Sequence, residues 1–174
     1  MAERPQSPLK DQLWRFQGRQ GERGAVFSPC RRYRYALWRQ WSGAGDYAVV
    51  VGLNPSTADE TADDPTVRRC IAFARHWGYG GLCMINLFAF RATRPAALIA
   101  AAEPVGPEND QWLQTCCAPA GVIVAAWGRR GSWLHRDQDV RCLLPPLHVL
   151  RLGKTACPLH PLYLPKTLRP MPWI

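Results

Sequence analysis

The sequence contains no two cysteines in a C-x-x-C arrangement. Its seven cysteines are an odd number and lie scattered along the chain: Cys30, Cys70, Cys83, Cys116, Cys117, Cys142 and Cys157. This spacing argues against a disulfide framework, a zinc ribbon and a four-cysteine cluster. Several of these cysteines stand in apolar runs, so we expect them to pack as small core residues.

Long hydrophobic runs are also absent. No stretch of eighteen apolar residues occurs, and the N-terminal segment has no hydrophobic signal core. We therefore expect no membrane partner and a cytoplasmic location. There is no internal repeat and no linker that would divide the 174 residues, which are enough for one domain with a real core. We expect a flexible N-terminal arm over residues 1–28 and a single α/β domain over residues 29–174.

Lysine is scarce, and Lys10, Lys154 and Lys166 are the only three. Arginine supplies the rest of the 22 basic residues, which face 13 acidic ones and give a net charge of +9. A domain this basic favours polyanions, with nucleic acid as the first candidate partner and a nucleotide as the second. A solvated basic surface explains the charge equally well.

One basic segment alternates with a period of two. Tyr33, Tyr35 and Leu37 fall on one face, and Arg32, Arg34 and Ala36 fall on the other. The alternation predicts a strand with one wet, basic face. Two interpretations stay open: contact with nucleic acid, or an edge strand whose arginines oppose pairing with another chain. We favour the second.

The chain is organised around an apolar run at residues 48–51 that stops at Gly52 and continues as Leu53, Asn54 and Pro55. This pattern predicts a buried strand that ends in a sharp loop. Because proline disfavours the helical conformation in the residue before it, Asn54 is expected on an extended segment after the strand. In open α/β sheets ligands bind at that carboxyl edge.

The segment that follows predicts a strand–helix–strand unit. Asp64 and Pro65 have the form of a helix start, as N-cap and first helical residue. The apolar run at 82–90 is broken only by Asn86 and predicts a second buried strand, parallel to the first. Further strands are predicted at 121–127 and 147–152, and further helices at 95–102, 108–117 and 133–144. We expect a three-layer α/β/α fold with a central, mainly parallel four-stranded sheet.

Polar groups follow all four predicted strands. Asn54 follows the first, Asn86 stands where the second should leave the core, Gly128-Arg129-Arg130 follows the third, and His160 comes after the last. Carboxyl ends of parallel strands meet at one edge of a sheet. We therefore expect the side chains of Asn54, Asn86 and His160 to face one cavity.

These motifs, in this order, resemble those of the uracil-DNA glycosylase superfamily. Gly52-Leu53-Asn54-Pro55 is similar to its first motif, and Met84-Ile85-Asn86-Leu87 is similar to its middle strand ending in asparagine. The strand at 122–128 resembles its later strand ending in glycine, and His160-Pro161-Leu162-Tyr163 resembles its last, His-Pro-Ser motif. The blocks GLNPSTAD, DDPTVRRC and AAWG also resemble an uncharacterised bacterial domain family of unknown function, over roughly Pro29 to Tyr163.

The superfamily resemblance implies a uracil-DNA-glycosylase-like fold and hydrolysis of the N-glycosidic bond of a flipped base, in DNA rather than RNA. It implies a monomer that needs no cofactor and no metal. Asn54 would position the attacking water, and His160 would donate a hydrogen bond to the base oxygen as charge develops there. The implied substrate-binding residues are Gly52, Leu53, Pro55, Ser56, Asn86 and Phe88, and the implied phosphate-binding residues are Arg129, Arg130 and Lys154.

Three other functions remain open. One is a non-catalytic module that binds nucleic acid or a nucleotide on the same fold. Another is a hydrolase acting on free nucleosides or nucleotides. The third is a metal site, because the loop before the predicted helix that starts at Asp64 and Pro65 carries several carboxylates. The ligands of such a site would be Asp59, Asp63, Asp64 and His160.

Overall fold

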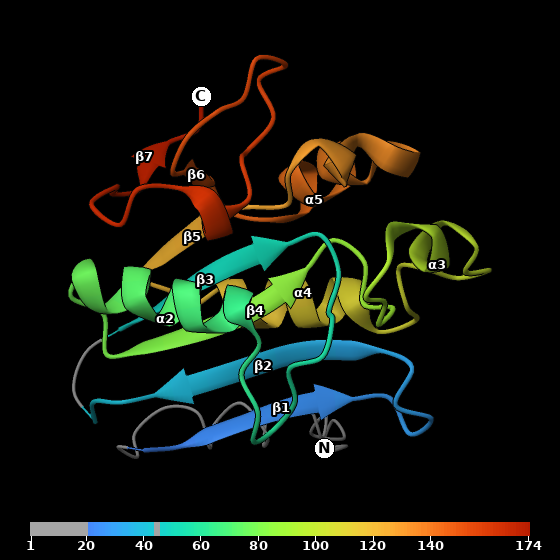
Figure 1. Cartoon of the computed structure of the whole chain (residues 1–174), viewed down its shortest axis with the longest axis horizontal. Helices are drawn as coiled ribbons and strands as arrows, with labels where there is room; N and C mark the ends of the chain where they lie inside the picture. Colours follow the sequence, from blue (N-terminus) through green and yellow to red (C-terminus); the bar gives the residue numbers. More distant parts are fainter. Residues whose placement is uncertain (1–20, 44–45) are drawn as a thin grey trace, which may run out of the picture.

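The computed structural model describes residues 21–43 and 46–174. The strands are β1 (Arg23–Phe27), β2 (Arg34–Gln40), β3 (Tyr47–Gly52), β4 (Gly81–Asn86), β5 (Val122–Ala125), β6 (His148–Val149) and β7 (Met171–Pro172). The α-helices in this part of the chain are α2 (Pro65–His76), α3 (Pro95–Ile99), α4 (Asn109–Cys117) and α5 (Arg136–Leu143). Two short 3₁₀ segments, η1 (Arg129–His135) and η2 (Pro161–Tyr163), complete a mixed α/β fold (Figure 1).

The seven strands form one mixed sheet in the order β1-β2-β4-β3-β5-β6-β7. The pairings β4–β3, β3–β5 and β5–β6 are parallel, whereas β1–β2, β2–β4 and β6–β7 are antiparallel. The prediction of a mainly parallel sheet of four strands was therefore wrong, because the sheet has seven strands and three of its six pairings are antiparallel. The antiparallel strands β1 and β2 extend the sheet beyond β4, and the C-terminal residues add β7 at the opposite edge (Figure 1).

The predicted strand–helix–strand unit is confirmed. β3 and β4 run parallel in a register that extends from Tyr47 opposite Gly81 to Gly52 opposite Asn86. Between them, the carboxylate of Asp64 accepts a hydrogen bond of 2.8 Å from the backbone N–H of Val67 and so caps α2. This register brings the ends of both strands to the same level.

Helices cover both faces of the sheet. The buried residues of α2 pack with sheet residues on one face; they are Val67, Cys70, Phe73 and Ala74. The buried residues of α4 pack on the opposite face, and Figure 1 shows this helix behind the strands; they include Trp112, Leu113, Cys116 and Cys117. The chain therefore has helix, sheet and helix layers, and its buried cysteines are small core residues, as expected.

Three segments differ from the sequence prediction. The helix predicted at 133–144 starts at Arg136, because Leu134 and His135 take positive φ angles of 56° and 55°. The strand predicted at 147–152 pairs only at His148–Val149. Of the arm predicted at 1–28, residues 1–20 lie outside the described residues, and Arg23–Phe27 forms β1.

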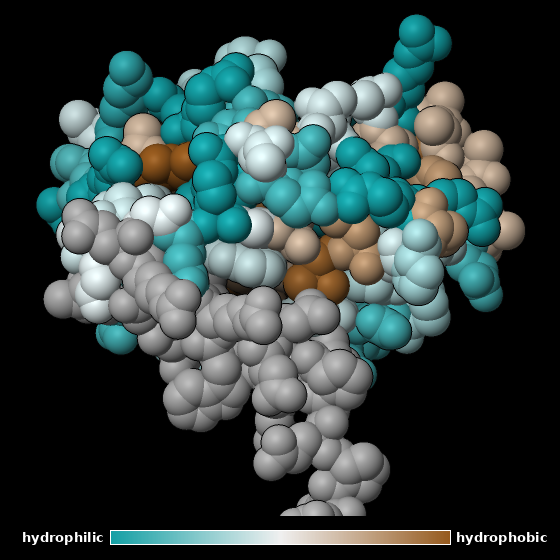
Figure 2. Space-filling view, turned by 90° about the horizontal axis from the view of Figure 1, so that it is seen from below, coloured by the Kyte–Doolittle hydropathy of each residue, from teal (hydrophilic) through white to brown (hydrophobic). Residues whose placement is uncertain are grey.

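Figure 2 shows the molecule from below, where the part of the surface that is coloured is largely hydrophilic, with white, tan and brown residues between the teal ones. Within residues 21–43 and 46–174 no helix has both the length and the apolar character needed to cross a membrane.

Candidate functional site

A cavity of about 440 Å³ opens at the carboxyl ends of β3, β4 and β5. Its polar lining consists of Arg34, Asn54, Ser56, Asp64, Thr66, Asn86, Thr93, Arg129, Arg130 and His160. The chain passes from β3 to β4 on one side and then crosses to β5 on the other. The cavity therefore lies at a topological switch point, where open α/β sheets bind their ligands.

Asn54 is held in place by its own amide. Its Nδ2 donates hydrogen bonds to the carbonyls of Pro55 (2.9 Å) and Ala92 (2.8 Å). Both donors are thereby used, and the side-chain oxygen of Asn54 makes no hydrogen bond with any described residue. Because Asn54 lines the cavity, it can present an acceptor there.

Asn86 is the second amide of the cavity and is only 3% exposed. Its Nδ2 is buried and has no hydrogen-bond partner among the described residues. A side chain on Gly52 would exclude this arrangement, because a Cβ built there would lie 2.8 Å from the Asn86 oxygen. A buried amide donor without a partner is costly, so a ligand that accepts from it would gain binding energy.

His160 lies at the start of η2, where its ring nitrogen Nδ1 accepts a hydrogen bond of 3.3 Å from the backbone N–H of Leu162. The neutral imidazole must then carry its proton on Nε2. Burial lowers the pKa of His160, and the nearby negative charge of Asp64 only partly opposes this effect. His160 is therefore a neutral hydrogen-bond donor near pH 7.

Asp64 is the only carboxylate that lines the cavity in the described part of the chain. One of its oxygens caps α2, and the other makes no hydrogen bond with a described residue. From the sequence, Asp64 was predicted to cap a helix and to belong to an acidic loop. Its position in the structure adds a carboxylate that can accept a proton to the cavity lining.

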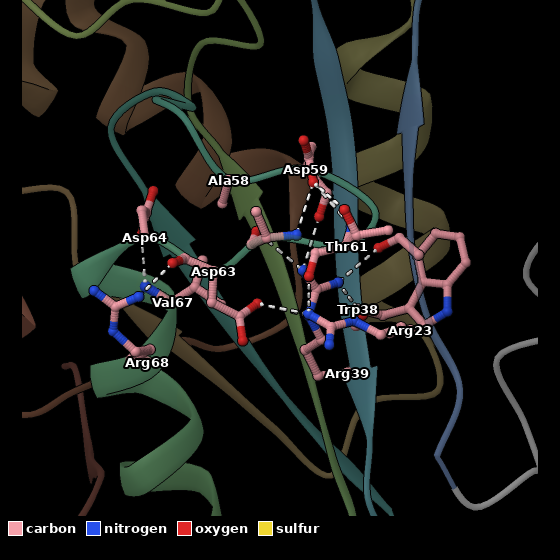
Figure 3. A network of polar contacts seen from close by, with 12 residues as sticks. Arg23, Trp38, Arg39, Ala58, Asp59, Thr61, Asp63, Asp64, Val67 and Arg68 are labelled. Atoms are coloured by element: carbon pink, nitrogen blue, oxygen red, sulfur yellow. Dashed lines mark hydrogen bonds and ion pairs between the residues drawn. The ribbon is translucent and has the colours of Figure 1, made fainter.

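The other acidic residues of this loop are engaged elsewhere. Asp59 accepts from the backbone of Thr61 and Ala62, and these bonds lower its pKa. Glu60 pairs with Arg31, and Asp63 pairs with Arg39 on β2, as Figure 3 shows for the Asp63 contact. Among residues 21–43 and 46–174 no three His, Cys, Asp or Glu side chains come together as a metal-binding group.

Arg34 is the residue that sequence reasoning placed wrongly. It was expected on a wet face, but it is 2% exposed and lines the cavity. The reason is that β2 is not the edge strand that the sequence favoured: it lies between β1 and β4, and Ala36 and Leu37 are buried on its two opposite faces. A β-bulge also lies here, because Val26 pairs with Ala36 and Phe27 with Arg34, so Tyr35 is an extra residue in β2.

The remaining predicted residues divide into two groups. Gly52, Leu53 and Ser56 line the cavity, and the exposed Arg129 and Arg130 stand at the same site, after Gly128 with its φ of 73°. Pro55, Phe88 and Lys154 do not line it. Phe88 is fully buried, with its ring 5.0 Å from that of Trp133, so the structure uses it in the core.

The fold and the cavity together define an α/β protein with a polar cavity at the switch point of its parallel strands. The chain belongs to the family described as "Protein of unknown function (DUF1643)", whose model matches residues 34–162. This confirms the predicted membership of a family of unknown function, and the match spans every residue that lines the cavity. No curated protein and no solved structure matches the chain significantly.

Proposed function

We propose that this protein is a hydrolase of the uracil-DNA glycosylase type, which cleaves the N-glycosidic bond of a flipped base in nucleic acid. One observation carries the proposal: Asn54, Asn86 and His160, far apart in the sequence, line a single cavity of about 440 Å³. Along the chain these three residues come in the same order as the superfamily motifs that they resemble. The strand order around β3 adds support, because the cavity lies at the switch point.

When the N-glycosidic bond breaks, its electron pair stays on the ring nitrogen of the base and is shared with the carbonyl oxygens of the base. His160 donates a hydrogen bond from Nε2 to such an oxygen, and it does so without changing its protonation state, because burial lowers its pKa. The unpartnered Nδ2 of Asn86 donates to a second acceptor on the base edge. Both donors strengthen as the base gains charge, which favours the transition state over the ground state.

The sugar must then be captured by water. The side-chain oxygen of Asn54 accepts a hydrogen bond from this water and orients it. An amide cannot take up the proton, but the carboxylate of Asp64 lines the same cavity and can. Asn54 thus positions the water, and Asp64 acts as the general base.

The partner in this proposal is DNA, bound by a monomer. Arg129 and Arg130 are exposed and line the cavity, so they can hold the phosphates that flank the flipped nucleotide. Lys154 is exposed in a loop away from the cavity lining and would contact a more distant phosphate. The net charge of +9 gives the nonspecific part of such binding.

The test is a screen of oligonucleotides that carry uracil, hypoxanthine, thymine mismatches or modified pyrimidines, assayed for abasic sites. Base release by the full chain is expected on at least one substrate. It should fall about 100-fold in His160→Ala, which removes one donor to the developing anion. His76→Ala is the matched control, since His76 is exposed at the end of α2 and outside the cavity.

The two rival functions give different results in the same screen. If the wild-type chain releases no base from any substrate but binds oligonucleotides, and Asn54→Ala and His160→Ala bind equally well, the protein is a binding module. If it instead hydrolyses free nucleotides, and its affinity for them responds little to salt, the substrate is not a polymer.

A further inference from the structure

The guanidinium of Arg34 is a buried positive charge with few partners. It donates one hydrogen bond of 2.9 Å, from Nη1 to the carbonyl of Ala58, and makes no ion pair with any described residue. Its Nε is buried without a partner. Burying a charge costs several kcal/mol unless it is paired, so this arrangement does not serve stability alone.

The charges around Arg34 leave it positive. Burial lowers its pKa to about 10, which keeps it protonated at neutral pH. Among the charged groups around it Asp64 has the largest effect and raises the pKa of Arg34, whereas Arg91 and Arg39 lower it. Arg39 is itself neutralised by Asp63. Within the described residues Arg34 is therefore a cation without an ion-pair partner, and it lines the cavity together with Asn86.

We infer that Arg34 and Asn86 form an oxyanion-binding subsite: the cavity takes a ligand that places a negatively charged oxygen against the Arg34 guanidinium. Both side chains line the cavity, and each carries a buried N–H group without a partner in the described part of the chain, Nε of Arg34 and Nδ2 of Asn86. A guanidinium holds such an oxygen through charge-assisted hydrogen bonds.

The oxyanion can come from two sources. In the proposed hydrolase the oxyanion is the carbonyl oxygen of the departing base. For this source the inference rests on the proposed function, because the base occupies the same cavity. In a free nucleotide it is a phosphate oxygen. Both share one chemistry, an anionic oxygen on a small ligand, and binding experiments separate them.

The experiment measures binding to the full chain by calorimetry at neutral pH, with matched pairs of probes. Nitrouracil, which is largely ionised there, is compared with neutral uracil, and deoxyuridine monophosphate is compared with deoxyuridine. We expect one of the two anions to bind at least about tenfold more tightly than its neutral counterpart. This preference should vanish in Arg34→Gln and persist in part in Arg34→Lys.

The control variant is Arg151→Gln, which removes one charge from an exposed arginine outside the cavity and should leave the preference intact. A preference for nitrouracil identifies the base anion as the source, and a preference for the monophosphate identifies phosphate. The inference is overturned if neither anion is preferred by the wild-type chain, or if Arg34→Gln keeps the preference. Oxyanion binding without base release would instead refute only the proposed hydrolase.

A measurement on the wild-type chain covers the case in which Arg34→Gln does not fold. With arginine labelled by ¹⁵N, the Nε–H resonance of Arg34 is assigned by its loss in Arg34→Lys. Addition of the preferred anion should shift this resonance and leave that of Arg151 unchanged. No shift at a saturating concentration would contradict direct contact.

Discussion

Two buried arginines on the same strand, Arg34 and Arg39, are used in opposite ways. Arg39 donates to the carboxylate of Asp63 at 2.7 Å and also reaches the backbone carbonyls of Gly24, Trp38, Asp59 and Ala62. Figure 3 shows it at the centre of this network. The side chain of Arg34, five residues earlier, has a single hydrogen bond and no ion pair in the described part of the chain.

The difference in hydrogen bonding indicates different roles for the two arginines, a structural role for Arg39 and a role in ligand binding for Arg34. Arg39 ties the loop that precedes α2 to the sheet, and its bonds satisfy a cation that burial disfavours. Arg34 is buried as deeply, yet its capacity for hydrogen bonding is largely unused. A cation kept in this state within a cavity is a typical sign of a binding site.

The largest expected effect on stability comes from Arg39→Met. This change leaves Asp63 without its close partner and removes four bonds to backbone carbonyls, so the free energy of unfolding should fall by roughly 3 kcal/mol. Urea denaturation measures it. Arg23→Met is the control: Arg23 is exposed and lies 3.5 Å from the same carboxylate, so its loss should cost less than about 1 kcal/mol. Equal losses would refute the structural role of Arg39.

The neighbouring carboxylates Asp63 and Asp64 allow the same comparison between a structural residue and a residue of the proposed catalytic site. Asp64→Asn keeps a side-chain oxygen to cap α2, so the free energy of unfolding should change by less than about 0.5 kcal/mol. The rate of base release should fall about 100-fold, because the proposed general base is gone. Asp63→Asn should do the reverse, losing stability through Arg39 while keeping the rate. If both variants lose rate equally, Asp64 does not act as the base.

Arg34→Met tests whether Arg34, in contrast to Arg39, contributes little to the stability of the fold. Replacing an unpaired buried charge by an apolar side chain of similar length should change the free energy of unfolding by no more than about 1 kcal/mol, in either direction. Urea denaturation beside Arg39→Met gives the contrast. A loss as large as that of Arg39→Met would mean that Arg34 holds the loop through Ala58, and that its burial is structural.

The positions of the two asparagines and the histidine could be predicted from the sequence, because the ends of the buried strands can be predicted from it. A glycine or an asparagine after an apolar run shows where a strand leaves the core, and parallel strands bring such ends together. Asn54, Asn86 and His160 were therefore placed correctly around one cavity. Their chemical roles stay predictions.

The burial of Arg34 was not predictable, because the alternation shows which residues share a face but not that β1 and β4 flank this strand and that both of its faces are covered. The extra residue at Tyr35 changes the face of Ala36 and Leu37, and no residue type in this segment indicates the bulge. Phe88 was misplaced for another reason. The superfamily resemblance implied that Phe88 binds substrate, but the chain leaves β4 at Asn86 and packs Phe88 against Trp133. The outer strands β1 and β7 are short and weakly patterned, so the sheet was underestimated.

The smallest expected effect is a pH dependence that involves His160. Because burial lowers its pKa in the folded chain, protonation favours the unfolded state, where histidine has a pKa of about 6.5. The contribution of neutral His160 is thus present above that value and is lost as the pH falls through the lower, folded pKa. Protonation also places a hydrogen on Nδ1, opposite the N–H of Leu162, and ends their hydrogen bond. Urea denaturation across this range should show a steeper loss of stability for the wild-type chain than for His160→Gln, and parallel curves would mean that His160 is not held neutral.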